Sequence, residues 1–194
     1  MEVAENVYLY KSQIDLATCN NIIGLIKDYY KNNKFELHIR ENRTVIANHN
    51  DPDFNIYLKD IITFIEQSYL KETGKTIYLK GFWLSDHKPG PNGRLHSDRD
   101  HSPYNLDFEA SAIAYFNSDF SGGDIEFPHL KYSLQPSTGD IILFRSYGTN
   151  YMHRVNSISS GNRYSVAMWF TTIKENRVQF LYPEKLSDSA SQDA

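Results

Sequence analysis

The second half of the chain limits the fold most, because short runs of strand-forming residues alternate there with turn signals. Strands are expected at Ile77–Ser85, Ser111–Asn117, Asp124–Phe127, Asp140–Phe144 and Arg163–Thr172. Segments rich in glycine, proline, serine or asparagine separate several of these runs. Many short strands joined by regular turns are typical of a β-sandwich or barrel.

The first part of the chain has a different periodicity. Ile14–Tyr30 and Phe54–Leu70 carry apolar residues at helical spacing. Asp15 or Thr18 could cap the first of these helices, and Gly74 is a reasonable stop for the second. Between them, Phe35–Ala47 alternates and is rich in strand formers. No linker is visible, so we expect one domain.

The expected architecture is mainly β, with a small barrel buttressed by two or three N-terminal helices. The helices and first strands occupy about residues 1–75, and the barrel core occupies about 76–182. The small polar residues of 186–194 are expected to form a flexible tail.

The composition limits the partners, cross-links and metal sites that the chain can have. The 194 residues have a formal net charge of −4, which argues against a broad nucleic-acid footprint. Cys19 is the single cysteine, so neither an internal disulfide nor a thiolate metal cluster can form, and we expect it in the core. No secretory signal or membrane-length apolar run is visible, so the expected location is the cytoplasm.

Two motifs could bind a metal. His96 and Asp98 are two residues apart, so on a strand both side chains would share one face, although a polar loop explains them equally well. His153 follows a turn and an apolar strand, and by itself it reads as a surface histidine. Neither signal is specific alone.

Arg163 is the third unusual feature. On a strand it would share a face with Ser165, Ala167 and Trp169. An arginine in that company suits neither a solvent face nor a core face unless its guanidinium meets an anion. The alternative is an edge-strand arginine paired with a surface carboxylate.

Together these features are more informative. His96, Asp98 and His153 provide the two imidazoles and one carboxylate of the facial triad that non-haem iron(II) oxygenases use. Three metal positions would stay open, two for a bidentate 2-oxo acid and one for O₂. Arg163 would bind the far carboxylate of 2-oxoglutarate through its planar fork.

The stretch from His87 to Phe170 resembles the 2-oxoglutarate/iron(II) dioxygenase superfamily, and within it the prolyl 4-hydroxylase-like group. The matching motifs, in the family's order and spacing, are His96-Ser97-Asp98, Tyr115-Phe116-Asn117, Gly122-Gly123-Asp124-Ile125-Glu126-Phe127-Pro128, Gly139-Asp140, His153 and Arg163. The resemblance implies a double-stranded β-helix, or jelly roll (a cupin-like barrel), with iron at its open end.

The resemblance also implies roles for further residues. Tyr115 matches a tyrosine that helps to hold the 2-oxoglutarate carboxylate, and Ile125 and Trp169 match positions in the same pocket. Plain core packing is the alternative for all three. The family often has a tyrosine before the first ligand, but this chain has none there. Trp83 or His87 could replace it, or the contact is absent; His87 could also line the substrate entrance or lie exposed in a loop.

The expected reaction is hydroxylation of an unactivated C–H bond, with release of succinate and CO₂ and with ascorbate as a possible reductant. Asp98 disfavours halogenation, since related halogenases lack this carboxylate. Trp169 stands where nucleic-acid demethylases of the superfamily carry a second arginine.

A peptide or protein proline is the leading substrate. A free amino acid or another small molecule is the alternative, and a non-catalytic jelly-roll binding module is an alternative of a different class. Regiochemistry and oligomeric state cannot be inferred from the sequence.

Overall fold

A computed structural model describes residues 1–32, 37–40, 43–46, 51–100 and 102–179. The described part of the chain forms one eight-stranded antiparallel sheet, here called the main sheet. Its strands, in spatial order, are β1 (Glu2–Ala4), β2 (Val7–Tyr10), β10 (Ile141–Arg145), β6 (Phe108–Tyr115), β13 (Arg163–Thr171), β5 (Tyr78–His87), β4 (Arg43–Ile46) and β3 (Leu37–Arg40).

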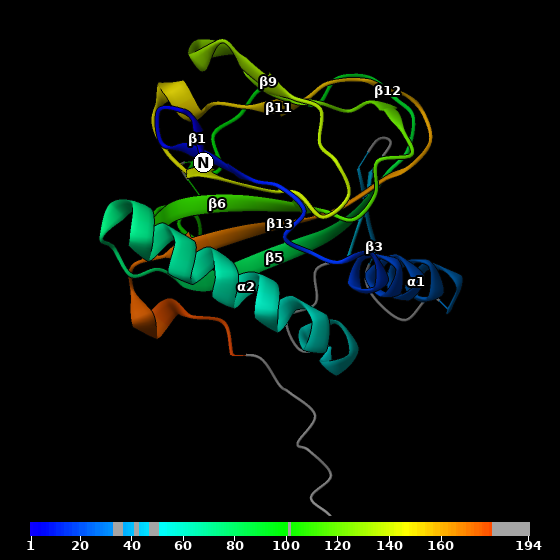
Figure 1. The fold of residues 1–194 in the computed structure, drawn as a ribbon, viewed down its shortest axis with the longest axis horizontal. Helices are drawn as coiled ribbons and strands as arrows, with labels where there is room; N and C mark the ends of the chain where they lie inside the picture. The colour runs from blue at the N-terminus through cyan, green and yellow to red at the C-terminus, as the bar shows by residue number, and fades with distance from the viewer. Residues whose placement is uncertain (33–36, 41–42, 47–50, 101, 180–194) are drawn as a thin grey trace, which may run out of the picture.

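Two smaller sheets complete the β structure. One consists of β11 (Arg154–Val155), β8 (Ile125–Phe127) and β9 (Tyr132–Leu134), and the other pairs β12 (Ile158–Ser160) with β7 (Ser121–Gly122). Short 3-10 turns occur at Pro128–Leu130, Thr149–Tyr151 and Lys174–Asn176. The β9, β11 and β12 strands lie on one side of β6, β13 and β5 (Figure 1). We call the side of the main sheet that faces them its inner face.

In the described residues, two α-helices cover the outer face of the main sheet: α1 (Leu16–Asn32) and α2 (Pro52–Thr73) (Figure 1). Alternate residues of the central strands, such as Val166 and Met168 of β13, join helix residues in the larger apolar core. Asp51 accepts the backbone N–H groups of Asp53 and Phe54 at the start of α2. Gly74 ends that helix in the left-handed conformation that glycine tolerates best.

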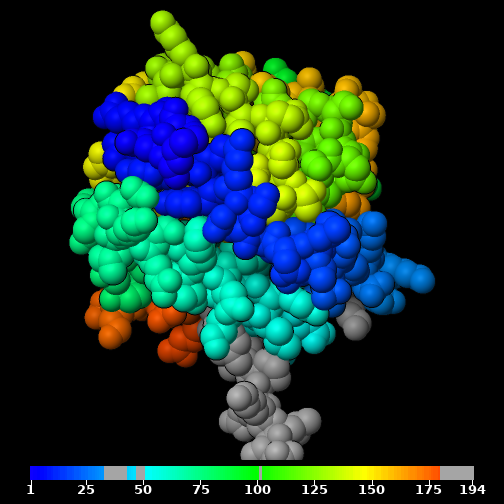
Figure 2. Space-filling model, viewed as in Figure 1, coloured from blue at the N-terminus to red at the C-terminus, as the bar shows by residue number. Residues whose placement is uncertain are grey.

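The N-terminal residues belong to the sheet, which the sequence did not reveal. β2 pairs with β10, and Figure 2 shows the first residues crossing the surface between α2 and the upper strands. Gly139 holds this segment, because its carbonyl accepts the backbone N–H groups of Gln13 and Ile14. Asp140 adds a carboxylate oxygen 3.0 Å from the N–H of Ser12.

Most of the expected elements are confirmed. Both helices, the strands that became β5, β6, β8, β10 and β13, and the buried Cys19 are where we expected them. The alternating stretch 35–47 contains the hairpin β3–β4, with parts outside the described residues. The tail 186–194, His49 and His101 also lie outside them. Among the described helices, none combines the length and the apolar character needed to cross a bilayer.

Gly139→Ala tests the attachment of the N-terminal segment. Gly139 has a φ of 82°, and an added Cβ would lie 2.3 Å from the carbonyl oxygen of Ile14. Gly74→Ala is the matched control, because Gly74 has a φ of 73° but no atom within 4 Å of an added Cβ. We expect Gly74→Ala to cost about 1–2 kcal/mol through backbone strain alone. Gly139→Ala should cost distinctly more in urea unfolding, and equal losses would contradict the close approach.

Candidate metal centre and anion site

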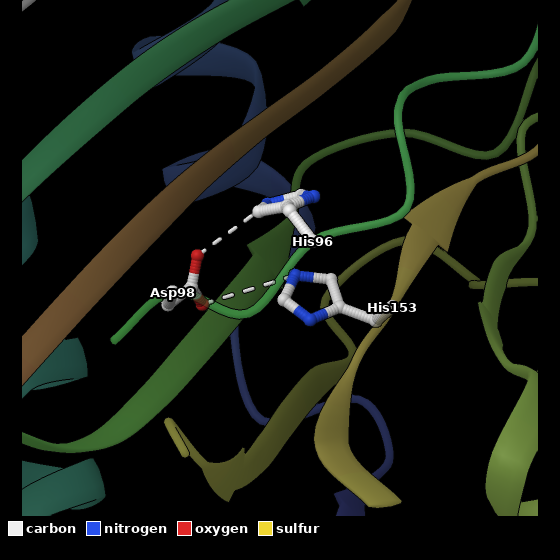
Figure 3. A group of neighbouring side chains, drawn as sticks. All are labelled: His96, Asp98 and His153. Atoms are coloured by element: carbon white, nitrogen blue, oxygen red, sulfur yellow. Dashed lines mark ion pairs between the residues drawn. The ribbon is translucent and has the colours of Figure 1, made fainter. Parts of the chain in front are cut away.

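His96, Asp98 and His153 converge on one point (Figure 3). The Nε2 atom of His96 lies 3.5 Å from one carboxylate oxygen of Asp98, and that of His153 lies 3.8 Å from the other. One candidate ligand atom from each residue falls within 4.8 Å of the others. The structure therefore brings together the three residues that the sequence suggested.

The reason for this convergence differs from the one expected. His96 and Asp98 do not lie on a regular strand; they lie in the loop between β5 and β6. His96 and His153 form an isolated β-bridge, in which each backbone N–H donates to the other's carbonyl, at 3.0 and 2.8 Å. The Ser97 hydroxyl donates to the Ser146 carbonyl at 2.9 Å and fixes the loop on the side of β10.

Both imidazoles are oriented through their second nitrogen. Nδ1 of His96 lies 2.8 Å from the carbonyl oxygen of Arg94, and Nδ1 of His153 lies 3.1 Å from that of Tyr151. A carbonyl can only accept, so each Nδ1 carries a proton and each Nε2 presents its lone pair to the centre. Metal-binding histidines are commonly fixed by this kind of hydrogen bond.

The electrostatics of the centre favour a bound cation. Burial tends to raise the pKa of Asp98, but His153, His96 and the hydroxyl of Ser111 outweigh it and lower that pKa, so the carboxylate is ionised. Burial lowers the pKa of His153 against the opposing charge of Asp98, which keeps this imidazole neutral. For His96, the hydrogen bond and charge of Asp98 outweigh burial and raise the pKa.

The donor set suits iron(II). Two imidazole nitrogens and one carboxylate oxygen approach from one side, which leaves positions open for other ligands. The side chain of His153 is 5% exposed and that of Asp98 is 10% exposed, whereas that of His96 is 47% exposed. The centre is thus accessible from the His96 side.

A buried arginine forms a second site on the same inner face. Arg163 is 1% exposed, yet no carboxylate in the described residues lies within ion-pair distance of it. Its Nε and Nη2 atoms are buried without a hydrogen-bond partner among those residues, as is the hydroxyl of Tyr115. The guanidinium lies 4.8 Å from the centre of the Tyr115 ring.

The charge of Arg163 and the protonated hydroxyl of Tyr115 make this pair a candidate anion site. Burial lowers the pKa of Arg163, but a guanidinium remains charged in proteins. Burial raises the pKa of Tyr115 to about 12 although Arg163 opposes this, so the phenol keeps its proton. Among the described residues, the site therefore presents N–H and O–H donors that lack an acceptor, on a guanidinium with no carboxylate within ion-pair distance and only the longer-range charge of Asp124 to oppose its own. A carboxylate would satisfy all of them.

The inner face of β13 connects the two sites. Ser165 and Ala167 follow Arg163 on this face, and Trp169 follows them. Trp169 pairs across the sheet with Ser111, the residue whose hydroxyl lies beside Asp98. Small side chains therefore form the floor between the anion site and the metal centre.

The Gly122-Gly123 pair permits close packing around Arg163. Both residues have positive φ, at 75° and 73°. An added Cβ at Gly122 would lie 2.1 Å from the carbonyl oxygen of Ser157, and one at Gly123 would lie 3.2 Å from Cδ of Arg163. The motif thus lets the loop approach both the β12 segment and the arginine.

The remaining expected site residues have mixed outcomes. Ile125 is fully buried in the inner apolar cluster with Tyr115, and Trp169 packs against Trp83 with ring centres 4.9 Å apart. Their contact with a cofactor stays a prediction. No local sequence pattern indicated Ser111, because its position beside Asp98 depends on a loop contact.

Comparison with protein-family models matches residues 82–171 to the 2OG-Fe(II) oxygenase superfamily. The matched segment contains the whole triad, Tyr115 and Arg163. This segment of the chain is therefore similar to the 2OG-Fe(II) oxygenase superfamily.

Solved structures with the same fold include three prolyl hydroxylases. A viral collagen prolyl hydroxylase from Paramecium bursaria Chlorella virus-1, described as a 2OG complex, has a TM-score of 0.71 and 17% identity, and covers 88% of this chain and 97% of its own. A Pseudomonas putida prolyl-4-hydroxylase has a TM-score of 0.68 at 17% identity, covering 86% and 92%. A prolyl hydroxylase from Trichoplax adhaerens, in complex with a hypoxia inducible factor peptide fragment, has a TM-score of 0.70 at 14% identity, covering 89% and 86%. The likeness supports the expected mainly β fold, with a large antiparallel sheet and two helices in the described residues.

Curated relatives of the chain include prolyl 3-hydroxylases. Prolyl 3-hydroxylase 2 of Homo sapiens is 39% identical over 66 residues, and that of Gallus gallus is 38% identical over the same length. Each match covers 31% of this chain but only 9% of the relative. The relatives are thus much longer proteins that share one segment with this chain.

Removal of a triad residue should strongly weaken metal binding by the protein. We expect Asp98→Ala and His153→Ala to weaken Co(II) binding by more than about tenfold, since loss of outer partners alone has effects of this size. His129→Ala is the control, because His129 is exposed and lies outside the triad. Isothermal titration measures the affinities. Wild-type Co(II) binding by Asp98→Ala would contradict the assignment.

Arg163→Met should stabilise the protein while it removes the anion site. An uncompensated buried charge is costly, so we expect the free energy of unfolding without ligand to rise by about 1 kcal/mol or more. Arg154→Met is the control with the opposite sign. Arg154 pairs with Glu126 at 2.7 Å on a partly exposed surface, and its loss should cost about 0.2–1 kcal/mol. A fall in stability for Arg163→Met would show that the guanidinium already has a good partner.

Proposed function

We propose that this protein is an iron(II)- and 2-oxoglutarate-dependent hydroxylase that acts on a proline of a peptide or protein. One observation carries the cofactor assignment: the uncompensated guanidinium of Arg163 is joined to the metal triad by a floor of small residues. A molecule with a carboxylate at one end and a metal-chelating group at the other matches this arrangement. 2-Oxoglutarate is such a molecule.

The protein would hold each reactant with separate residues. His96, Asp98 and His153 would bind iron(II), and Arg163 and Tyr115 would bind the far carboxylate of 2-oxoglutarate. When bound, the iron centre supplies the oxidising chemistry that converts 2-oxoglutarate and O₂ into succinate, CO₂ and a hydroxylated product. The chain's contribution is ligation, orientation and exclusion of water at the buried Arg163 end. The exposed side of His96 is then the approach for the substrate.

The aromatic residues beside the metal centre support a proline substrate. Trp169 contacts Trp83 edge to face, and it stacks on Phe108 with ring centres 5.8 Å apart. Both tryptophans are partly exposed. A pyrrolidine ring is apolar and rigid, and it can pack on such faces. The similar prolyl hydroxylases, one of them in complex with a peptide fragment, also support a peptide or protein proline as substrate.

The ring carbon that would be oxidised is a separate question. The similar solved structures include a prolyl-4-hydroxylase, whereas the curated relatives are prolyl 3-hydroxylases. These two comparisons disagree about regiochemistry, so the experiment must resolve it. A free amino acid is the competing substrate class.

A peptide panel tests the proposal. The iron-loaded protein, 2-oxoglutarate and O₂ are incubated with proline-containing peptides, with the same peptides carrying alanine for proline, and with free proline. We expect a gain of one oxygen atom only in the proline peptides, with one succinate per hydroxylation. Hydrolysed products compared with 3- and 4-hydroxyproline standards identify the carbon.

Each other outcome has a defined meaning. Hydroxylation of free proline alone would replace the peptide proposal with the small-molecule alternative. Peptide binding without succinate, unchanged in Asp98→Ala, would indicate a non-catalytic binding module and overturn the proposal. Asp98→Ala is also the inactive control for the mass gain.

A further inference from the structure

Three basic side chains form a row across the inner face of the main sheet. Arg43 of β4 pairs across the sheet with His87 of β5, and His87 pairs with Arg163 of β13. Directly paired residues in antiparallel strands lie about 5 Å apart on the same face. His87 is therefore placed between two guanidinium-bearing residues.

His87 contacts the guanidinium of Arg163 directly. Nδ1 of His87 lies 3.3 Å from Nη1 of Arg163, and the hydroxyl of Ser165 lies 3.2 Å from the same nitrogen. Because Nη1 is a donor, Nδ1 must accept, and the imidazole carries its proton on Nε2. Among the described residues, both hydrogen bonds of the arginine are thus made by Nη1.

The remaining donors of Arg163 form one edge of the guanidinium. Nε and Nη2 are the two atoms that lack a partner among the described residues. In a guanidinium these atoms point their N–H groups the same way, so together they can take both oxygens of one carboxylate. The contact to His87 thereby determines which edge is left for a ligand.

The surroundings keep His87 in the accepting state. Burial, followed by the charges of Arg43 and Arg163, lowers the pKa of His87 to about 2. The imidazole is thus neutral at any pH at which the protein would work. The guanidinium of Arg43 is oriented by Ser85, because its Nε and Nη2 donate to the Ser85 hydroxyl at 3.1 and 2.9 Å.

We propose that His87 is a positioning residue for 2-oxoglutarate: by accepting from Nη1, it aims the Nε–Nη2 edge of Arg163 at the far carboxylate of the cofactor. This inference rests on the proposed function. It assigns a role to the segment where the resembling family often has a tyrosine and this chain has none. His87 acts through Arg163 and need not touch the reacting atoms.

Two substitutions of His87 distinguish the loss of its hydrogen-bond acceptor from a change in side-chain shape. His87→Leu removes the acceptor, and His87→Asn restores an amide oxygen close to the position of Nδ1. Binding of radiolabelled 2-oxoglutarate to the Zn(II)-loaded protein is measured by equilibrium dialysis, so turnover is not required. We expect His87→Leu to raise the dissociation constant about tenfold, the effect of one lost hydrogen bond, and His87→Asn to recover most of the affinity.

A double-mutant cycle with Arg163→Lys shows whether the effect passes through the arginine. Lysine lacks the two-donor edge, so His87→Leu should change 2-oxoglutarate binding less than about twofold in the Arg163→Lys background. In the iron enzyme, His87→Leu should raise KM for 2-oxoglutarate with little change in kcat, because the lost interaction is the same in the ground and transition states.

The outcomes distinguish this inference from the proposed function. Unchanged 2-oxoglutarate affinity in His87→Leu, or the same loss with Arg163→Lys present, would overturn the positioning role. If both His87→Leu and His87→Asn bound Zn(II) more weakly and unfolded at a lower midpoint, the substitutions would act through general destabilisation. That result would also overturn the positioning role. If the wild-type protein binds no 2-oxoglutarate, the proposed function itself fails.

Discussion

The alternation of side chains along β13 is the constraint on which the rest of the structure depends. This strand lies between β5 and β6, so both of its edges are hydrogen-bonded to neighbouring strands. Val166 and Met168 point to the helices and belong to the larger core, whereas Arg163 and Ser165 point to the inner face. A shift of one residue in register would turn Arg163 toward the helices and would turn Val166 and Met168 toward the inner face. The same hydrophobic pattern that fixes the fold therefore fixes the location of the charge.

The inner face combines an apolar wall with polar groups that the described residues leave unsatisfied. Phe144 and Phe127 pack against His153, with ring centres 4.8 and 5.6 Å apart. These contacts hold one ligand of the metal centre in a dry environment. At the other end, Arg163 and Tyr115 keep donors buried without acceptors. A folded protein tolerates such groups at a cost in stability, and this cost is the physical sign of a binding site.

The two ends of the site are built by different means. The metal end is assembled from loops: His96 and His153 are joined by a backbone bridge, and carbonyl oxygens orient both rings. The anion end is built on regular strands, where His87, Arg163 and Tyr115 take their positions from sheet register. Strands hold side chains more rigidly than loops do. The positions of the anion-site side chains therefore follow directly from the sheet register.

The sequence by itself determined the β-rich class, the two helices and the set His96, Asp98, His153 and Arg163, because periodicity, turn residues and motif spacing are local properties. It also suggested that Arg163 faces inward, since its strand neighbours on that face are small or aromatic. Only the tertiary structure decided that β1 and β2 extend the sheet, that Ser111 lies beside Asp98, and that His87 contacts Arg163. Those contacts join residues far apart in the chain. Their partners are selected by sheet register and loop closure, which short-range patterns do not encode.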